Sequence, residues 1–290
     1  MESVSYRRKQ MLDGFYTMGG GHFWEDVFFY QKWRIQRNYI NKHCRLLDNW
    51  DICRMEGSFD ECRKEFIKYI EAFEIARQKG HMIIMLPGWA ESKNIFKPLW
   101  RAAIKEGFMA AAINYPTTQK DLDGHVRQLD FLLNHLEDVE QVSFVAKGVG
   151  CVVLKKLFML ETPWRKRLKM GRIVEVAPLN HGSELLHSLS NNSIFNFVLG
   201  PAAKEMSPYN IERLPALPKD LETGVVINHS LTTKLIEKIT ANDTPTYSLE
   251  EEQKFEKAKD IVEFKCRKLN LFKNPKIVDA VIKFLMTGEF

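Results

Sequence analysis

Short, continuously apolar runs alternate with longer segments of helical periodicity along most of this chain. The apolar runs lie at residues 82–86, 108–113, 141–146, 171–177, 225–228 and 261–266. Segments with helical spacing lie at residues 58–80, 95–106, 122–136, 149–160 and 275–286. Strands that are apolar on both faces and are joined by helices form a parallel sheet covered on both sides. The pattern predicts an α/β fold with a doubly wound, mostly parallel sheet over residues 58–290.

Two local signals support this division into elements. Ser58 and Glu61 form the spacing of a capping box, which predicts a helix that begins just after Ser58. Pro275 predicts the first turn of a closing helix. Residues 180–222 are rich in Asn, Ser, Pro and Leu, which indicates a cap-like excursion from the sheet.

The first 57 residues have a different character, because they are dense in aromatic side chains and contain the turn signal Gly19-Gly20-Gly21. Loose alternation at residues 27–39, with the turn residues Asn41-Lys42 before residues 44–47, predicts an aromatic β-hairpin or small sheet as an extension. We expect this extension, residues 1–57, to pack on the α/β body. An aromatic interaction surface is the alternative.

Composition narrows the class of protein. With 45% hydrophobic and 27% charged residues among 290, the chain is globular, and its formal charge of +5 is too small to indicate a nucleic-acid binder by itself. The five cysteines are scattered and contain no Cys-x-x-Cys pair, which argues against a disulfide framework or a zinc site. We therefore expect an intracellular protein, cytoplasmic or of the mitochondrial matrix, without a metal or a cofactor.

The segment at residues 141–160 is the most informative one, because it predicts a strand, a tight turn and a helix. The turn reads Val-Ala-Lys-Gly-Val-Gly-Cys at residues 145–151. A nucleophile elbow has small residues two positions before and two positions after its nucleophile. Ala146 and Gly150 meet that requirement, which puts Gly148 at the nucleophile position.

From about His81 to Phe290 the chain resembles the bacterial-type α/β-hydrolase lipases and esterases. The first strand and its turn match at residues 82–88, with Pro87 where the family has histidine before Gly88. Asn114-Tyr115-Pro116 matches the Tyr-Pro end of the next strand. Lys147-Gly148-Val149-Gly150-Cys151 aligns with His-Ser-x-Gly-Gly of the family. The segments at residues 176–185 and 284–290 resemble its Ala-Pro-Pro-Asn-x-Gly-Ser motif and its carboxyl-terminal ending.

The resemblance implies where the other catalytic groups would lie. The acid would fall at Asp243, in an Asn-Asp turn after the seventh strand of the family. The base would fall in residues 266–273, where Lys268 and its neighbours include no histidine, and the last histidine of the chain is His229. Pro87 has no N–H to offer an oxyanion. The resemblance therefore implies a degenerate site, formed by Pro87, Gly88, Lys147, Gly148, Val149, Asp243 and Lys268.

These losses predict a catalytically inactive α/β-hydrolase-fold protein that acts as a binding or structural subunit in a larger assembly. One alternative is a hydrolase that uses unorthodox groups, with Cys151 beside His181 or Asp243. Another is a receptor for a small lipid-like ligand in the old pocket. Basic residues between Lys155 and Arg172 could contact an acidic partner, RNA or an anionic lipid surface.

Other polar residues give weaker indications of function. His125 and His135 are ten positions apart, which is not a metal-ligand spacing on one helix face, and we expect both to be structural surface residues. Ser143 falls in a predicted strand and has no candidate base in the sequence.

Overall fold

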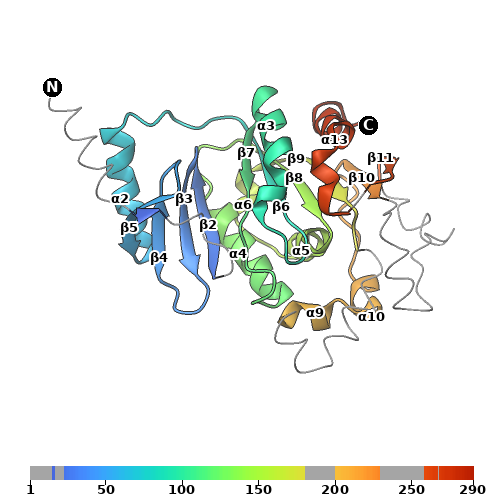
Figure 1. Ribbon diagram of the computed structural model, residues 1–290, viewed down its shortest axis with the longest axis horizontal. Helices are drawn as coiled ribbons and strands as arrows, with labels where there is room; N and C mark the ends of the chain where they lie inside the picture. Colours follow the sequence, from blue (N-terminus) through green and yellow to red (C-terminus); the bar gives the residue numbers. More distant parts are fainter. Residues whose placement is uncertain (1–14, 17–22, 180–199, 229–257, 267) are drawn as a thin grey trace.

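The computed structural model describes residues 15–16, 23–179, 200–228, 258–266 and 268–290. Two sheets organise this part of the chain (Figure 1). One has six strands in the order β11-β10-β9-β8-β6-β7, and all neighbours in it run parallel. The other has five antiparallel strands in the order β1-β5-β4-β3-β2. The predicted α/β architecture is confirmed.

The strands of the parallel sheet follow the predicted apolar runs. The run predicted at residues 171–177 begins earlier, at Lys169. The six strands are β6 (His81–Leu86), β7 (Met109–Ala112), β8 (Gln141–Lys147), β9 (Lys169–Val176), β10 (Thr223–Asn228) and β11 (Asp260–Phe264).

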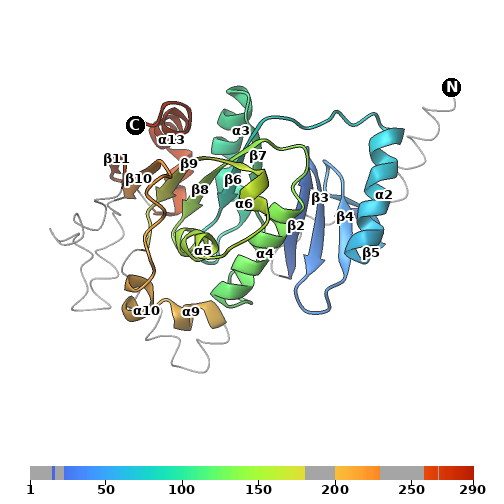
Figure 2. The ribbon, with the colours of Figure 1, turned by 180° about the vertical axis from the view of Figure 1, so that it is seen from behind.

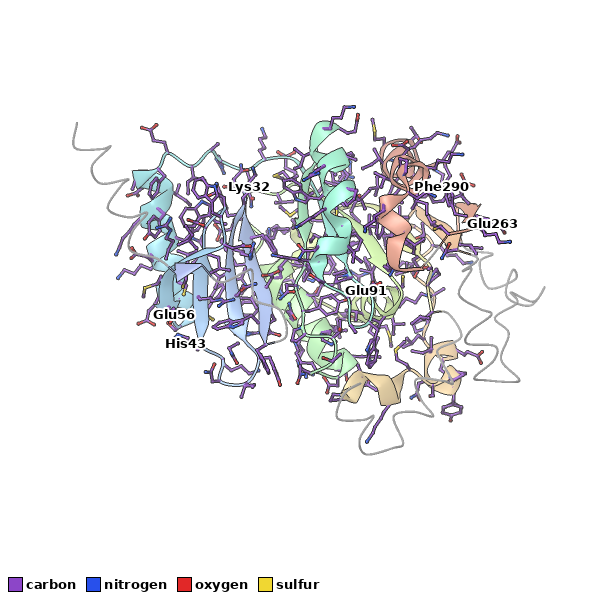
Figure 3. The ribbon with its side chains drawn as sticks, in the orientation of Figure 1. Lys32, His43, Glu56, Glu91, Glu263 and Phe290 are labelled. Carbon is purple, nitrogen blue, oxygen red and sulfur yellow. The ribbon has the colours of Figure 1, made fainter. Side chains whose placement is uncertain are left out.

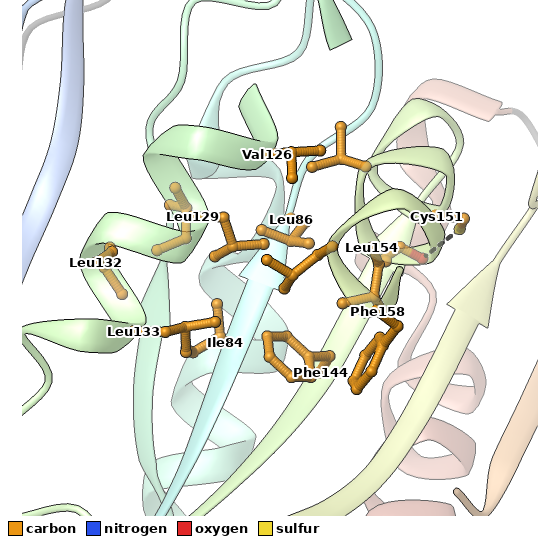
Figure 4. Packing of buried hydrophobic residues seen from close by; sticks show 14 of the residues in the cluster. Ile84, Leu86, Val126, Leu129, Leu132, Leu133, Phe144, Cys151, Leu154 and Phe158 are labelled. Carbon is orange, nitrogen blue, oxygen red and sulfur yellow. Dashed lines mark hydrogen bonds between the residues drawn. The ribbon is translucent and has the colours of Figure 1, made fainter. Parts of the chain in front are cut away.

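Helices cover both faces of this sheet. Ile84 of β6 and Phe144 of β8 pack against one layer, formed by α4 (Leu122–Asn134) and α5 (Val149–Phe158). Figure 4 shows this layer, with Leu129 and Leu133 of α4 and Leu154 and Phe158 of α5 facing the strands. The neighbouring residues Ile83 and Val145 point the other way, into a second layer. Burial on both faces is why these strands read as unbroken apolar runs.

The second layer is built from α3 (Lys97–Lys105) and α13 (Pro275–Thr287). A 3₁₀ turn, η1 (Lys93–Phe96), precedes α3, and another, η2 (Lys268–Lys273), precedes α13. A short helix, α6 (Trp164–Arg167), joins α5 to β9. None of the described helices is both long and apolar enough to cross a membrane.

The predicted cap-like excursion at residues 180–222 lies partly outside the described residues. Its described part contains α9 (Pro201–Glu205) and α10 (Pro208–Glu212). Ala202, Met206 and Ile211 are buried in the same layer as α4 and α5. This part of the excursion therefore packs on the body.

Of the two predicted alternatives, hairpin or small sheet, the amino-terminal segment forms the sheet. It contains β1 (Phe15–Tyr16), β2 (Trp24–Tyr30), β3 (Trp33–Asn38), β4 (Cys44–Leu47) and β5 (Ile52–Gly57). The prediction was incomplete because β1 and β5 are held by pairing across the sheet: Phe15 lies opposite Cys53, and Leu46 opposite Met55. Such long-range pairs leave no periodic signal in a single strand.

Helix α2 (Phe59–Ala72) packs on this antiparallel sheet through Cys62, Phe66 and Tyr69. Its predicted capping box is confirmed, since the Ser58 side chain accepts from the Glu61 N–H while the Glu61 carboxylate accepts from the Ser58 N–H. The division of the chain at residue 57 stays a prediction. Figure 2 shows α2 and its sheet at one end of the molecule and α13 with β11 at the other.

The two sheets meet where β2 lies beside the chain that leaves β7. The Asp26 N–H donates to the Asn114 carbonyl at 2.9 Å, and the Asp26 carboxylate accepts the Asn114 N–H at 2.6 Å. Gln128 of α4 donates to the carbonyls of both Asp26 and Asn114. The antiparallel sheet is thereby fixed to the edge of the parallel one.

Candidate functional site

The predicted strand, turn and helix are all present at the elbow. Strand β8 ends at Lys147, Gly148 adopts φ 52° and ψ −117°, and α5 begins at Val149, whose side chain is buried. The Gly148 N–H donates to the Val176 carbonyl of β9 at 3.1 Å, which fixes the turn against the neighbouring strand. A positive φ at this point is the strained conformation of a nucleophile elbow.

Space around the elbow differs at its two glycines. A Cβ atom on Gly148 would have one neighbour within 4 Å, the Gly88 Cα at 3.8 Å. A Cβ atom on Gly150 would lie only 2.8 Å from the Leu86 carbonyl oxygen. The backbone therefore admits a side chain at position 148 and excludes one at position 150, as an elbow requires.

The turn after β6 lies directly beside Gly148. Pro87 has no N–H, and its carbonyl accepts from the Tyr115 hydroxyl. The Gly88 N–H donates to Oε2 of Glu91 at 2.9 Å. This N–H beside the elbow is therefore bound to a carboxylate of the chain itself.

Glu91 also binds Lys147, the residue before Gly148. Its Oε1 atom forms an ion pair with the Lys147 ammonium, and the two side chains are only 13% and 3% exposed. Glu91 is labelled in Figure 3. Sequence reasoning identified Lys147 but missed Glu91, because no motif connects residues 91 and 147.

Cys151 is not presented by the elbow. The thiol is buried in α5 and donates to the Ala146 carbonyl at 3.2 Å. Burial raises the pKa of this thiol well above its usual range, so the thiolate is disfavoured. This geometry gives Cys151 neither the access nor the charge of a nucleophile.

The remaining predicted site residues are only partly described. Asp243 and His181 lie outside the described residues. Lys268 begins η2, shortly after β11, which is the predicted position of the base along the chain. The ends of β10 and β11 are joined there, since Oδ1 of Asn228 accepts from the Cys266 N–H at 3.1 Å and from its thiol at 3.3 Å.

Two expectations about histidines and Ser143 were wrong. His125 is buried at 3% exposure rather than on the surface, because it lies on the inner face of α4 against the Tyr115 ring. Ser143 does have a neighbouring base: its hydroxyl lies 2.8 Å from Nε2 of His81. Ser143 is fully buried, however, so this pair has no access to a substrate.

Most of the basic residues between Lys155 and Arg172 bind groups of this chain. Lys155 pairs with Glu175, Lys156 with Asp123, and Arg172 with Glu222. Arg165 and Arg167 donate to backbone carbonyls at the ends of α5 and α4. Within the described residues, Lys166 and Lys169 are exposed and have no carboxylate partner.

Metal binding finds no support in the part of the chain that the structure describes, where no three His, Cys, Asp or Glu side chains come together as a ligand set.

Sequence comparisons do not place the chain in a family. It matches no model of a known protein family. No curated protein matches it significantly.

The chain does resemble solved protein structures. A monoacylglycerol lipase from Paleococcus ferrophilus superposes with a TM-score of 0.51 at 14% identity, over 71% of this chain and 94% of the lipase. An esterase from Exiguobacterium antarcticum gives 0.46 at 10% identity, over 72% and 93% of the two chains. A thermophilic esterase from Thermogutta terrifontis also gives 0.46 at 10%, over 73% and 90%.

The lipase superposition covers 71% of this chain, which shows a shared fold. At this level of identity, structural similarity shows a shared architecture and does not show a shared activity. The chain has the α/β-hydrolase fold, with an antiparallel sheet of five strands added at the edge of its parallel sheet.

Proposed function

We propose that this chain is a catalytically inactive protein of α/β-hydrolase fold that acts as a binding or structural subunit of a larger assembly. The observation that carries the proposal is Gly148: the elbow has the required backbone and the space for a side chain, but its apex residue has none. Without a nucleophile, an acyl group cannot be transferred to the protein.

Two further features support the proposal. The Glu91 carboxylate accepts the Gly88 N–H, so a negative charge lies at the turn beside Gly148, where it disfavours a developing oxyanion. No histidine follows His229 in the sequence, so no imidazole is available at the expected position of the general base. The nucleophile position, the base position and the turn at Pro87-Gly88 thus all differ from those of an active hydrolase.

An ester-hydrolysis assay tests inactivity. We expect purified wild-type protein to hydrolyse p-nitrophenyl acetate and butyrate no faster than its Cys151→Ala variant. Gly148→Ser alone should stay inactive, because it supplies a hydroxyl without a base. Wild-type turnover that disappears in Cys151→Ala or Glu91→Gln would instead establish a hydrolase with unorthodox groups.

Purification of the full chain from its native source tests the binding role. We expect it to elute with a partner in fixed stoichiometry. If the basic residues between Lys155 and Arg172 contribute to binding, reversing the two exposed charges with Lys166→Glu and Lys169→Glu will release the partner. The matched control is Lys276→Glu, an exposed lysine on α13. Elution of the wild-type chain alone, at its monomer mass, would contradict the proposal.

A further inference from the structure

A cavity of about 530 Å³ lies at the antiparallel sheet, outside the degenerate site. The β2–β3 turn, the β4–β5 turn and the chain after α2 line this cavity, which is open on one side. β2 begins beside the carboxyl end of β7, because Asp26 binds Asn114, and the turn at Gln31-Lys32 comes at its other end. The cavity therefore lies away from the elbow. Its size falls within the range of about 300–1,000 Å³ that is typical of small-molecule sites.

Aromatic side chains form most of its apolar wall. Trp33 is buried against α2, with its ring centroid 5.1 Å from that of Tyr69 and 6.5 Å from that of Phe73. Trp50, by contrast, is 59% exposed although it is a large apolar side chain. Its turn is ordered, since the Asp48 carboxylate accepts the N–H groups of Trp50 and Ile52 at 2.8 and 3.0 Å. An exposed indole on a fixed turn is a preformed stacking surface.

The charged side chains that line the cavity have a net charge of +1. Asp48 and Arg54 neutralise each other, because the Asp48 carboxylate accepts from Nε and Nη2 of Arg54 at 2.9 and 2.7 Å. Lys32 is exposed; its ammonium lies 6.0 Å from the centre of the Trp100 ring and has no carboxylate partner among the described residues. Two cations and one anion in the wall give a net charge of +1. Figure 3 shows Lys32 at the opposite end of β3 from His43.

We propose that this cavity binds a small molecule with a flat apolar body and a single anionic group. The apolar body lies against Trp50 and Trp33, and the anionic group pairs with the Lys32 ammonium. Net charge and aromatic lining select this class over a neutral or cationic ligand. Since the cavity contains no residue of the elbow, the inference does not depend on whether the chain is catalytic.

Two dyes with the same aromatic skeleton test the proposal on the full chain. 8-Anilinonaphthalene-1-sulfonate carries one negative charge, and N-phenyl-1-naphthylamine carries none. We expect saturable binding of the sulfonate, with one dye per chain, measured by fluorescence titration. The sulfonate should bind more tightly than the neutral dye, and its advantage should shrink as salt is raised.

Substitutions at the cavity separate charge from stacking. Lys32→Met should weaken sulfonate binding about fivefold and leave the neutral dye unchanged. Trp50→Ala should weaken both dyes about fivefold or more, because it removes the stacking surface. Lys276→Met and Phe23→Ala are matched controls, an exposed lysine on α13 and an exposed aromatic outside the cavity, and should bind as the wild type does.

Three results would overturn the proposal: equal affinity of the wild type for the two dyes, unchanged binding by Lys32→Met and Trp50→Ala, or binding that falls as protein concentration rises. The last result would show that a second copy of the chain covers the cavity. Thermal melts of each variant establish that it is folded before it is titrated.

Discussion

Gly148 and Gly150 are both required for the elbow, but for different physical reasons. Gly148 has a positive φ, which costs free energy for any side chain, yet its surroundings leave room for one. Gly150 lies in the first turn of α5, against the backbone of Leu86 and Pro87, and leaves no room. The sequence shows two glycines and cannot separate these causes.

Alanine substitutions separate them. Gly148→Ala should lower the free energy of unfolding by about 1 kcal/mol, from backbone strain alone. Gly150→Ala should lower it by about 3 kcal/mol, because the methyl group collides with the Leu86 carbonyl and the strand or helix must move. Urea unfolding followed by circular dichroism measures both. Equal losses for the two variants would contradict this account of the elbow.

His125 provides a pH-dependent contribution to stability. Burial, with a smaller effect from Lys120, lowers the pKa of its imidazole to about 3, whereas an unfolded histidine titrates at about 6.5. Between these values the unfolded chain binds one proton more than the folded chain. The free energy of unfolding therefore falls by about 1.4 kcal/mol for each pH unit below about 6.5.

Replacing His125 tests this directly. Relative to wild type, His125→Leu should gain about 2 kcal/mol of stability between pH 7 and pH 5, because the variant lacks the penalty of protonation. Denaturant unfolding at the two pH values measures the difference. A difference that is independent of pH would show that His125 is accessible to protons in the fold.

At the scale of elements, the Lys147–Glu91 ion pair joins the end of β8 to the loop after β6. These are the two segments that form the elbow and the Pro87-Gly88 turn beside it. A buried ion pair costs desolvation for both partners, so it is a weak source of stability by itself. Removing one partner is costly, since it leaves the other charge buried.

A double-mutant cycle measures this coupling. Lys147→Met and Glu91→Gln should each lower the free energy of unfolding by about 3 kcal/mol, and the double variant should lose clearly less than the sum. Glu91→Gln keeps an oxygen that can accept the Gly88 N–H. The free energy of unfolding that this variant loses therefore measures the effect of the charge. Additive losses would mean that the two side chains are solvated and do not depend on each other.

At the scale of the whole molecule, the junction between the two sheets depends on buried polar groups. The Asp26 carboxylate is fully buried and accepts from Asn114 and from Gln36, at 2.6 and 2.8 Å. Glu25, one residue earlier, is also buried and binds Arg37 and Lys120. Because Lys120 lies in the α/β body, these contacts connect the antiparallel sheet to that body.

Asp26→Asn should therefore destabilise the antiparallel sheet and its junction with the body more than it destabilises the parallel sheet. One carboxylate oxygen becomes an N–H₂ group that faces donors, which we expect to cost about 3 kcal/mol or more. Hydrogen exchange should show faster exchange in β2 and β3 than in β6 and β8. Glu56→Gln, at an exposed position of β5, is the control and should change the free energy of unfolding by less than about 0.5 kcal/mol. Uniform exchange across both sheets would contradict a separable junction.

The sequence alone determined the architecture of the body, because the signals there are local. A strand buried on both faces is mostly apolar, as β6 is from Met82 to Leu86 and β8 is apart from Gln141, Ser143 and Lys147, and the covering helices repeat apolar residues at helical spacing. The capping box at Ser58 and the two small residues of the elbow are likewise written within a few positions. Gly148 at the apex could be found in the same way.

Only the tertiary structure decided which side chains meet. It placed Glu91 on Lys147, turned His125 inward against Tyr115 and paired most of the basic residues between Lys155 and Arg172 with groups of the chain itself. It also formed the predicted hairpin or small sheet as a sheet of five strands, with a cavity beside Trp33 and Trp50. Periodicity along a chain fixes which elements form, but contacts between distant residues depend on how those elements pack, and that information is not local to any segment.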